Sequence, residues 1–149
     1  MSKRHRSRRL ALQALCCIDV QGEKSLDLVQ EFIDDSDDPL ETRLTARDFL
    51  QGALAERDLC DRLLKRHAKH WNLDRLALVD RNILRLAVCE LRSGKVPKKV
   101  AINEALVLAQ EFSTAESPRF VNGVLDAIAR ELETAEPPPP GEPAGHETK

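Results

Sequence analysis

Apolar residues recur three or four positions apart along most of this chain, the spacing that places side chains on one face of an α-helix. The segment after Asp80 is the clearest case, with one stripe made of Ile83, Leu84, Ala87, Val88 and Leu91. Residues that favour strands are scarce, since aromatic residues make up 3% of the chain and Tyr is absent. We therefore predict an all-α fold with a single helical core.

Cap and turn residues divide this pattern into six or seven helices. The first is expected over about 7–21, before Gly22, and a short amphipathic segment covers 26–33. The acidic stretch DDSDDPLE is typical of a solvated loop. One long helix, or two nearly continuous ones, is expected over about 42–70.

The second half of the chain carries further end signals. Asp80 is predicted to cap the helix after WNLDRL, and Gly94 to end it. The segment AINEALVLAQEF continues the helical period. Ser117 is predicted to cap the last helix, with Pro118 in its first turn.

Composition sets the limits of the folded part. Residues 135–149 hold five of the eight prolines and no large apolar residue, so we predict a disordered tail there. Residues 1–6 are predicted to form a basic arm, and 7–134 the helical domain. No uncharged apolar stretch of about 18 residues exists, so we expect no membrane-spanning helix.

Motifs for catalysis or metal binding are absent from the sequence. It contains no Gly-rich phosphate loop and no HExxH pair. Cys60, His67 and His70 share a helix face that could suit zinc, but KRHAKH is more typical of a solvated helix end. The four cysteines form no CxxC pair, and we expect reduced, mostly buried thiols. We predict a protein that is not an enzyme and holds no metal or cofactor.

Positive charge is concentrated at the start of the chain. Five Lys or Arg residues fall among the first nine, and no acid follows until Asp19, although the net charge is −2. Cations at a helix N-terminus oppose the helix dipole, so an anionic partner would offset their cost. Arginine forks suit phosphates and base edges, which favours nucleic acid, with a membrane surface or nonspecific charge as alternatives. No convincing recognition helix for the major groove of DNA is present.

Several segments resemble the NusB family of bacterial transcription antitermination factors. They are RRLALQAL near the start, then DRNILRLAVCEL, VPKKVAINEALVLAQEF and SPRFVNGVLDAIA. The resemblance implies a bundle of two packed three-helix subdomains and a cytoplasmic, non-catalytic protein. Such a protein binds boxA-type single-stranded RNA with the small-subunit ribosomal protein that serves as NusE, within the RNA polymerase antitermination complex on ribosomal RNA operons. The alternative is a helical protein–protein scaffold with only nonspecific affinity for nucleic acid, and either could form a homodimer.

The same resemblance implies site residues. The RNA-binding set comprises Lys3, Arg4, His5, Arg6, Arg8, Arg9, Gln13, Phe112, Glu116 and Arg119. The candidates for contact with the protein partner are Arg75, Asp80, Arg81 and Glu90. This chain has Cys16 where relatives commonly have an aromatic residue, which predicts weaker or differently organised RNA binding.

Three motif residues are expected to serve the fold. Gly123 in mid-helix predicts a close helix–helix approach. Asn103 and Asn122 are expected to hydrogen-bond within the core, with direct ligand contact as the alternative.

Overall fold

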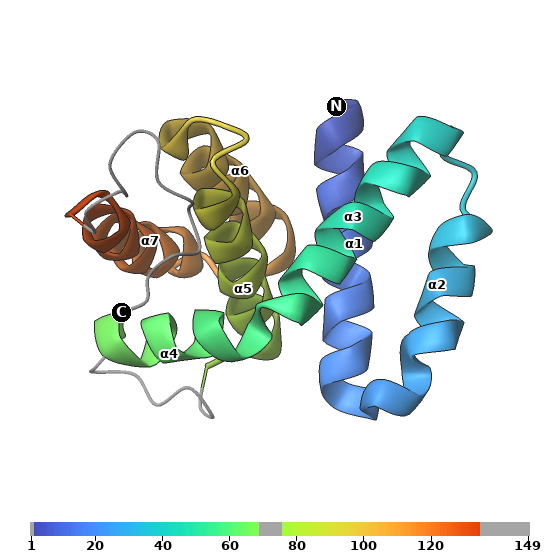
Figure 1. Cartoon of the computed structure of the whole chain (residues 1–149), viewed down its shortest axis with the longest axis horizontal. Helices are drawn as coiled ribbons and strands as arrows, with labels where there is room; N and C mark the ends of the chain where they lie inside the picture. Colours follow the sequence, from blue (N-terminus) through green and yellow to red (C-terminus); the bar gives the residue numbers. More distant parts are fainter. Residues whose placement is uncertain (1, 69–75, 135–149) are drawn as a thin grey trace, which may run out of the picture.

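The computed structural model describes residues 2–68 and 76–134, which form α-helices and one short 3-10 turn (Figure 1). The first half contains α1 (Lys3–Gln21), η1 (Glu23–Ser25), α2 (Leu26–Asp34), α3 (Leu40–Ala55) and α4 (Arg57–His67). The second half contains α5 (Leu78–Ser93), α6 (Lys98–Phe112) and α7 (Ser117–Thr134). These two ranges contain seven α-helices and no strand, which confirms the predicted all-α class. The tail predicted for 135–149 lies outside the described residues.

The helices form two packed groups of three, joined through α4 (Figure 1). In the first group α1 packs against α2 and α3, and in the second α5 packs against α6 and α7. The segment expected to be one long or two nearly continuous helices is two, because the chain turns at Glu56 between α3 and α4. From there α4 reaches across to contact α5 and α7.

The apolar stripes meet in one core between the two groups. The interior is made of aliphatic side chains with no exposed surface, among them Ile33, Leu50, Leu64, Ile83 and Leu84. On α1 the inward face includes Leu12, Leu15 and Ile18, and it contacts both α3 and α5. The basic start of α1 is therefore fixed to the rest of the fold by the apolar turns that follow it.

Three helix starts differ from the prediction. The first helix begins at Lys3 instead of about Ser7, because the Ser2 side chain accepts the His5 backbone N–H at 3.1 Å and caps it. Residues 3–6 are thus helical. Asp80 does not cap α5, which begins at Leu78 after Ala77; Asp80 lies in the first turn of that helix. Ser117 does not precede the last helix as a cap but is the first residue of α7, and its hydroxyl donates to the Asp80 carboxylate.

The roles within the core that were expected for the three motif residues are wrong. Asn103 and Asn122 are exposed, and so is Gly123, where an added Cβ would meet no atom within 4 Å. The close approach occurs at Gly52, where a Cβ would lie 3.0 Å from the Cys89 Sγ atom. The buried asparagine is Asn82, which donates to the Asp19 carboxylate and to the Leu78 carbonyl, both at 2.9 Å.

Candidate nucleic-acid interface

The first three turns of α1 sort the basic residues by exposure. Lys3, Arg4 and Arg6 are exposed, Arg9 is half-buried, and His5 and Arg8 are buried at 6% and 3% exposure. Successive residues of a helix are about 100° apart, so one basic segment presents side chains both to solvent and to the neighbouring helices. The predicted RNA-binding block therefore has two different roles within it.

Arg8 is bound inside the fold. Its Nε and Nη2 atoms donate to the two carboxylate oxygens of Glu90 on α5, each at 2.7 Å. Its guanidinium also lies 3.5 Å from Glu104 and 5.2 Å from the Phe49 ring centre. Burial alone would lower the pKa of Arg8, but the hydrogen bond and charge of Glu90 raise it above its ordinary value. Arg8 and Glu90, predicted for RNA and for the protein partner, bind each other in this structure.

His5 joins α1 to α6. Its Nε2 atom lies 2.8 Å from Glu111 Oε1, and its Nδ1 atom lies 3.2 Å from Glu104 Oε1. Ionised carboxylates only accept hydrogen bonds, so both contacts are hydrogen bonds only when the ring carries two protons. His5 and Arg8 together fix the orientation of the first turns of α1.

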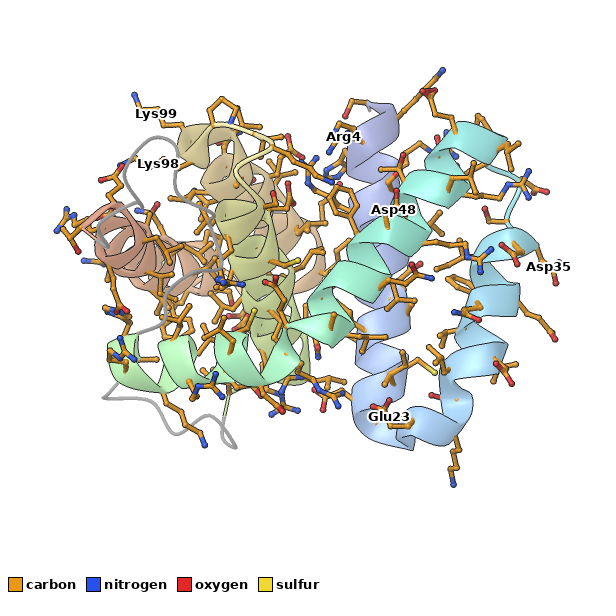
Figure 2. All side chains as sticks on the ribbon, viewed as in Figure 1. Arg4, Glu23, Asp35, Asp48, Lys98 and Lys99 are labelled. Carbon is orange, nitrogen blue, oxygen red and sulfur yellow. The ribbon has the colours of Figure 1, made fainter. Side chains whose placement is uncertain are left out.

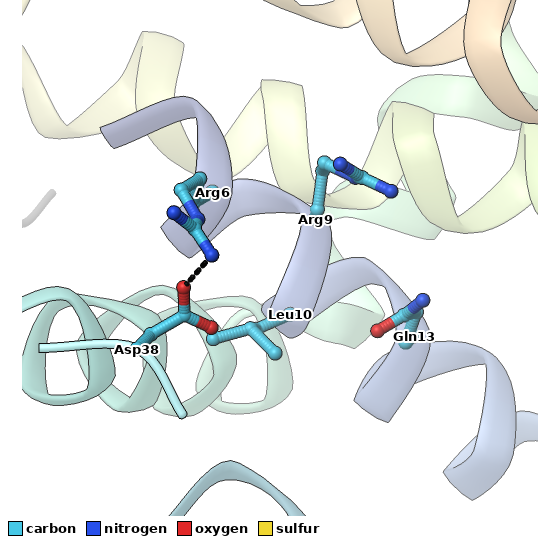
Figure 3. A pocket seen from close by; sticks show the side chains of 5 residues that line it. All are labelled: Arg6, Arg9, Leu10, Gln13 and Asp38. Carbon is cyan, nitrogen blue, oxygen red and sulfur yellow. Dashed lines mark ion pairs between the residues drawn. The ribbon is translucent and has the colours of Figure 1, made fainter. Parts of the chain in front are cut away.

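A shallow depression of about 200 Å³ lies beside α1, and Arg6 is the one of the three exposed basic residues that lines it (Figure 3). It is lined by Arg6, Arg9, Leu10, Gln13 and Asp38. Arg6 turns toward Asp38, with 2.5 Å between its Nη2 atom and the Oδ1 atom, while Arg9 points away from that pair (Figure 3). Two guanidinium groups and an amide beside one apolar residue can bind the phosphates and base edges of a single strand.

Arg9 lies between this depression and the C-terminal end of α6. Its Cζ atom lies 5.2 Å from the ring centre of Phe112, the last residue of α6. The fold thus brings together two predicted RNA-binding residues from distant segments. Glu116 and Arg119 are exposed just beyond, at the α6–α7 connection and in the first turn of α7, where they line a separate groove with Phe120.

The partner-binding candidates that the structure describes are engaged in internal contacts. Asp80 is buried, and its carboxylate accepts hydrogen bonds from the hydroxyls of Ser113 and Ser117, at 2.7 and 3.0 Å. Arg81 is half-buried and lies 2.8 Å from Asp19. Arg75 lies outside the described residues.

Several residues at this surface were not singled out from the sequence. Asp38 belongs to the acidic loop interpreted as solvated, yet its side chain is 11% exposed and faces Arg6. Phe49 supports both Arg4 and Arg8, whose Cζ atoms lie 5.4 and 5.2 Å from its ring centre. Arg4 lies at the start of α1 (Figure 2). The acidic cluster DDSDD in the sequence could have drawn attention to Asp38, but the pairing of Asp38 with Arg6 on α1 depends on the fold.

Cys16 does not line the depression. It lies near Asp19 and Asn82, beside α5, and burial followed by the Asp19 charge raises the pKa of its thiol to about 11. The substitution of the usual aromatic residue therefore affects the α1–α5 contact more directly than the exposed basic face.

Cysteine and histidine side chains form no metal site within the described ranges. His67 contacts Glu131 at 2.5 Å, and His70 lies outside those ranges. The Cys60 thiol is buried and donates to the Arg85 carbonyl at 3.8 Å, and burial raises its pKa to about 12. All four cysteines are free, and only Cys60 is fully buried. None of the described helices is long and apolar enough to cross a membrane.

A helical bundle that presents exposed arginines along one edge is the class of protein that this fold and surface define. The model of the NusB family matches residues 5–130. The chain belongs to the NusB family.

Similar proteins support this assignment. The transcription antitermination protein NusB of Solibacter usitatus (strain Ellin6076) is 42% identical over 141 residues, which cover 93% of this chain and 97% of the relative. NusB of Koribacter versatilis (strain Ellin345) is 44% identical over 133 residues, covering 87% and 90% of the two chains.

Two solved structures share the fold. NusB of T. maritima superposes with a TM-score of 0.78 at 36% identity, covering 86% of this chain and 91% of that one. A crystal structure of the antitermination factors NusB and NusE in complex with dsRNA gives a TM-score of 0.77 at 28% identity, covering 88% and 98%.

Proposed function

We propose that this protein is a non-enzymatic transcription antitermination factor that binds boxA-type RNA of the nascent transcript together with NusE. It acts in the cytoplasm as part of the RNA polymerase antitermination complex and supports transcription of ribosomal RNA operons. Membership of the NusB family over residues 5–130 carries this proposal. It favours RNA binding over the alternative of a pure protein scaffold, because the similar complex holds NusB, NusE and RNA.

The exposed residues of α1 are the proposed RNA contacts. Lys3, Arg4 and Arg6 are exposed, and Arg9 lies on the same depression as Gln13. Cations there would neutralise phosphates, while Gln13 and the Phe112 ring offer hydrogen bonds and a stacking surface to bases. His5 and Arg8 contribute by holding this helix in place through their carboxylate partners.

The remaining candidate residues are assigned either to RNA beyond Phe112 or to NusE. Glu116 and Arg119, both exposed, would meet RNA that runs beyond Phe112. For NusE we retain Arg75 and also Arg81, which is half-buried in the first turn of α5. Asp80 and Glu90 are left out of this surface, because the Asp80 carboxylate is buried against Ser113 and Ser117 and the Glu90 carboxylate is buried against Arg8.

Fluorescence anisotropy with a labelled boxA-like RNA and a scrambled control tests the proposal, with and without NusE and across a salt series. We expect tighter binding of the boxA-like RNA, sharpened by NusE. The logarithm of affinity should fall with the logarithm of salt concentration by about 0.7 per neutralised phosphate. A salt-dependent affinity without sequence preference would leave only a generic basic surface. If neither RNA bound, the alternative of a protein–protein scaffold would be favoured.

A further inference from the structure

An open groove of about 600 Å³ lies between α1 and α2, apart from the basic depression. Its apolar lining comes from Ala14 and Cys17 on α1 and from Leu28, Val29 and Phe32 on α2. Gln13 lines both this groove and the basic depression, so the two surfaces are adjacent along α1.

The α2 helix carries more apolar surface than its packing uses. Val29 and Ile33, four residues apart, are buried against the core. Leu28 and Phe32, one position earlier in each turn, form a second stripe that is 63% and 46% exposed. Two large apolar side chains exposed side by side over a groove are typical of a surface that binds another molecule.

The groove has an acidic rim. Residues 26–38 include six acidic residues and no Lys or Arg. Two of these acids, Glu31 and Asp35, line the groove itself, and Asp35 lies at the outer edge of the molecule (Figure 2). This charge disfavours RNA in the groove, although RNA is proposed for the surface beside it.

We propose that this groove binds an amphipathic helix of a protein partner, with an apolar face for Leu28 and Phe32 and Lys or Arg residues flanking that face. An apolar floor with rim charges of one sign is complementary to such a helix, which lies lengthwise and places its anchors three to four residues apart. The Lys or Arg side chains of the partner helix would form ion pairs with Glu31 and Asp35. The partner would lie next to the RNA without covering Arg6 or Arg9.

A second copy of this chain fits the groove less well. In a two-fold pair the same patch meets itself, so the two α2 helices would bring their acidic rims together. Like charges facing each other across an interface oppose association. The occupant is therefore expected to be a different, basic chain.

A direct test uses the full-length protein and a fluorescein-labelled 18-residue helical peptide of Leu, Ala and Lys with a single Leu face. Two control peptides have the same composition in scrambled order, or Glu in place of Lys. We expect saturable binding of the Leu/Lys helix, and binding at least about tenfold weaker for both controls, since each lacks one half of the complementarity.

Variants locate the peptide on the protein. The double variant Leu28→Ser/Phe32→Ser should weaken peptide binding at least about tenfold, and Glu31→Gln/Asp35→Asn should weaken it and flatten its salt dependence. Val100→Ser, an exposed apolar site on α6, and Asp58→Asn, an exposed acid on α4, are matched controls that should bind as the wild type does. All four positions changed in the groove variants are exposed, and circular dichroism melting confirms that the variants fold.

Other outcomes would overturn the inference. They are equal binding of the three peptides, or unchanged binding by the groove variants. A concentration-dependent dimer in sedimentation that the groove variants abolish would make a second copy the occupant. A loss of boxA-like RNA affinity in Leu28→Ser/Phe32→Ser would assign the groove to RNA. Unchanged RNA affinity in that variant is expected, and it separates this inference from the proposed antitermination function.

Discussion

Arg8 and Glu90 form a buried bidentate ion pair that ties the basic start of α1 to α5, with both N–O distances at 2.7 Å. The two residues are 82 positions apart in the chain. Their side chains are 3% and 7% exposed. The pair divides the basic segment into a part that holds the helix and a part that is exposed for a ligand.

Replacing Arg8 should therefore affect stability more than RNA contacts. Arg8→Ala leaves the Glu90 carboxylate buried without its partner, a change that costs about 3–5 kcal/mol. Arg6→Ala removes a pair whose arginine is 51% exposed, and it should cost less, about 1 kcal/mol. Urea denaturation of the two variants measures the difference. Equal, small effects would show that the Arg8–Glu90 pair contributes little to the fold.

Asp38 should restrain RNA binding, because it occupies the Arg6 guanidinium on the proposed RNA surface. Asp38→Asn should tighten the boxA-like RNA complex by about threefold to tenfold at low salt, the effect of removing one carboxylate beside a phosphate site. In an Arg6→Ala background the same substitution should have a much smaller effect, since the competition no longer exists. Anisotropy titrations of the four proteins complete the cycle. An equal gain in both backgrounds would show that Asp38 does not act on RNA binding through Arg6.

Acid should weaken the Asp19 network. Burial raises the pKa of Asp19, but hydrogen bonds from Asn82 and Arg81 and the Arg85 charge outweigh it, so the pKa falls below its ordinary value. A lowered carboxyl pKa stabilises the fold above the unfolded value of about 3.9, and this contribution is lost as the pH falls through the folded pKa.

The matched variant for this network is Asp19→Asn. Its free energy of unfolding should be lower than that of the wild type at pH 7, and the difference should shrink as the pH falls below about 4. Denaturant titrations at several pH values give both quantities. A difference that stays constant down to the acid limit would mean that the Asp19 charge is not what stabilises the fold.

Substituting alanine at Gly52 and at Gly123, both within helices, should change the stability of the protein differently. Gly123→Ala should raise stability by about 0.5–1 kcal/mol, because the site is exposed and helical and a methyl group meets no neighbour. Gly52→Ala should gain less or destabilise, since the methyl group would press on Cys89 Sγ at 3.0 Å. Thermal melting ranks the two. If Gly123→Ala destabilised the protein, another helix would have to lie close to Gly123, as the sequence predicted.

Periodicity predicted the helices well, because each stripe depends on residues only three or four positions apart. The start of α1 was missed because Ser2 precedes a polar, basic turn that carries no apolar stripe. Asp80 has the residue type of a cap, but its carboxylate binds Ser113 and Ser117 instead. Local sequence could not distinguish these two uses of the same carboxylate.

The candidate site was predictable in composition and not in detail. The sequence indicates a basic segment, and the NusB resemblance indicates its ligand. Which of these side chains are exposed depends on partners about 100 positions away, as with His5 and Glu104 or Glu111. No periodicity in the sequence encodes such a pairing, so the division between Arg8 and Arg6 emerges only from the packed helices.

The central claim is that Arg6 and Arg9, which line the depression beside α1, bind RNA, while the buried His5 and Arg8 hold the helix. The most direct measurement is the affinity of Arg6→Gln/Arg9→Gln for the boxA-like RNA, alongside its melting temperature. We expect affinity to fall by about tenfold or more, with the salt slope reduced by about 0.7 for each phosphate that the variant no longer neutralises. The melting temperature should change by no more than about 5 °C. Unchanged RNA affinity in this folded variant would contradict the claim.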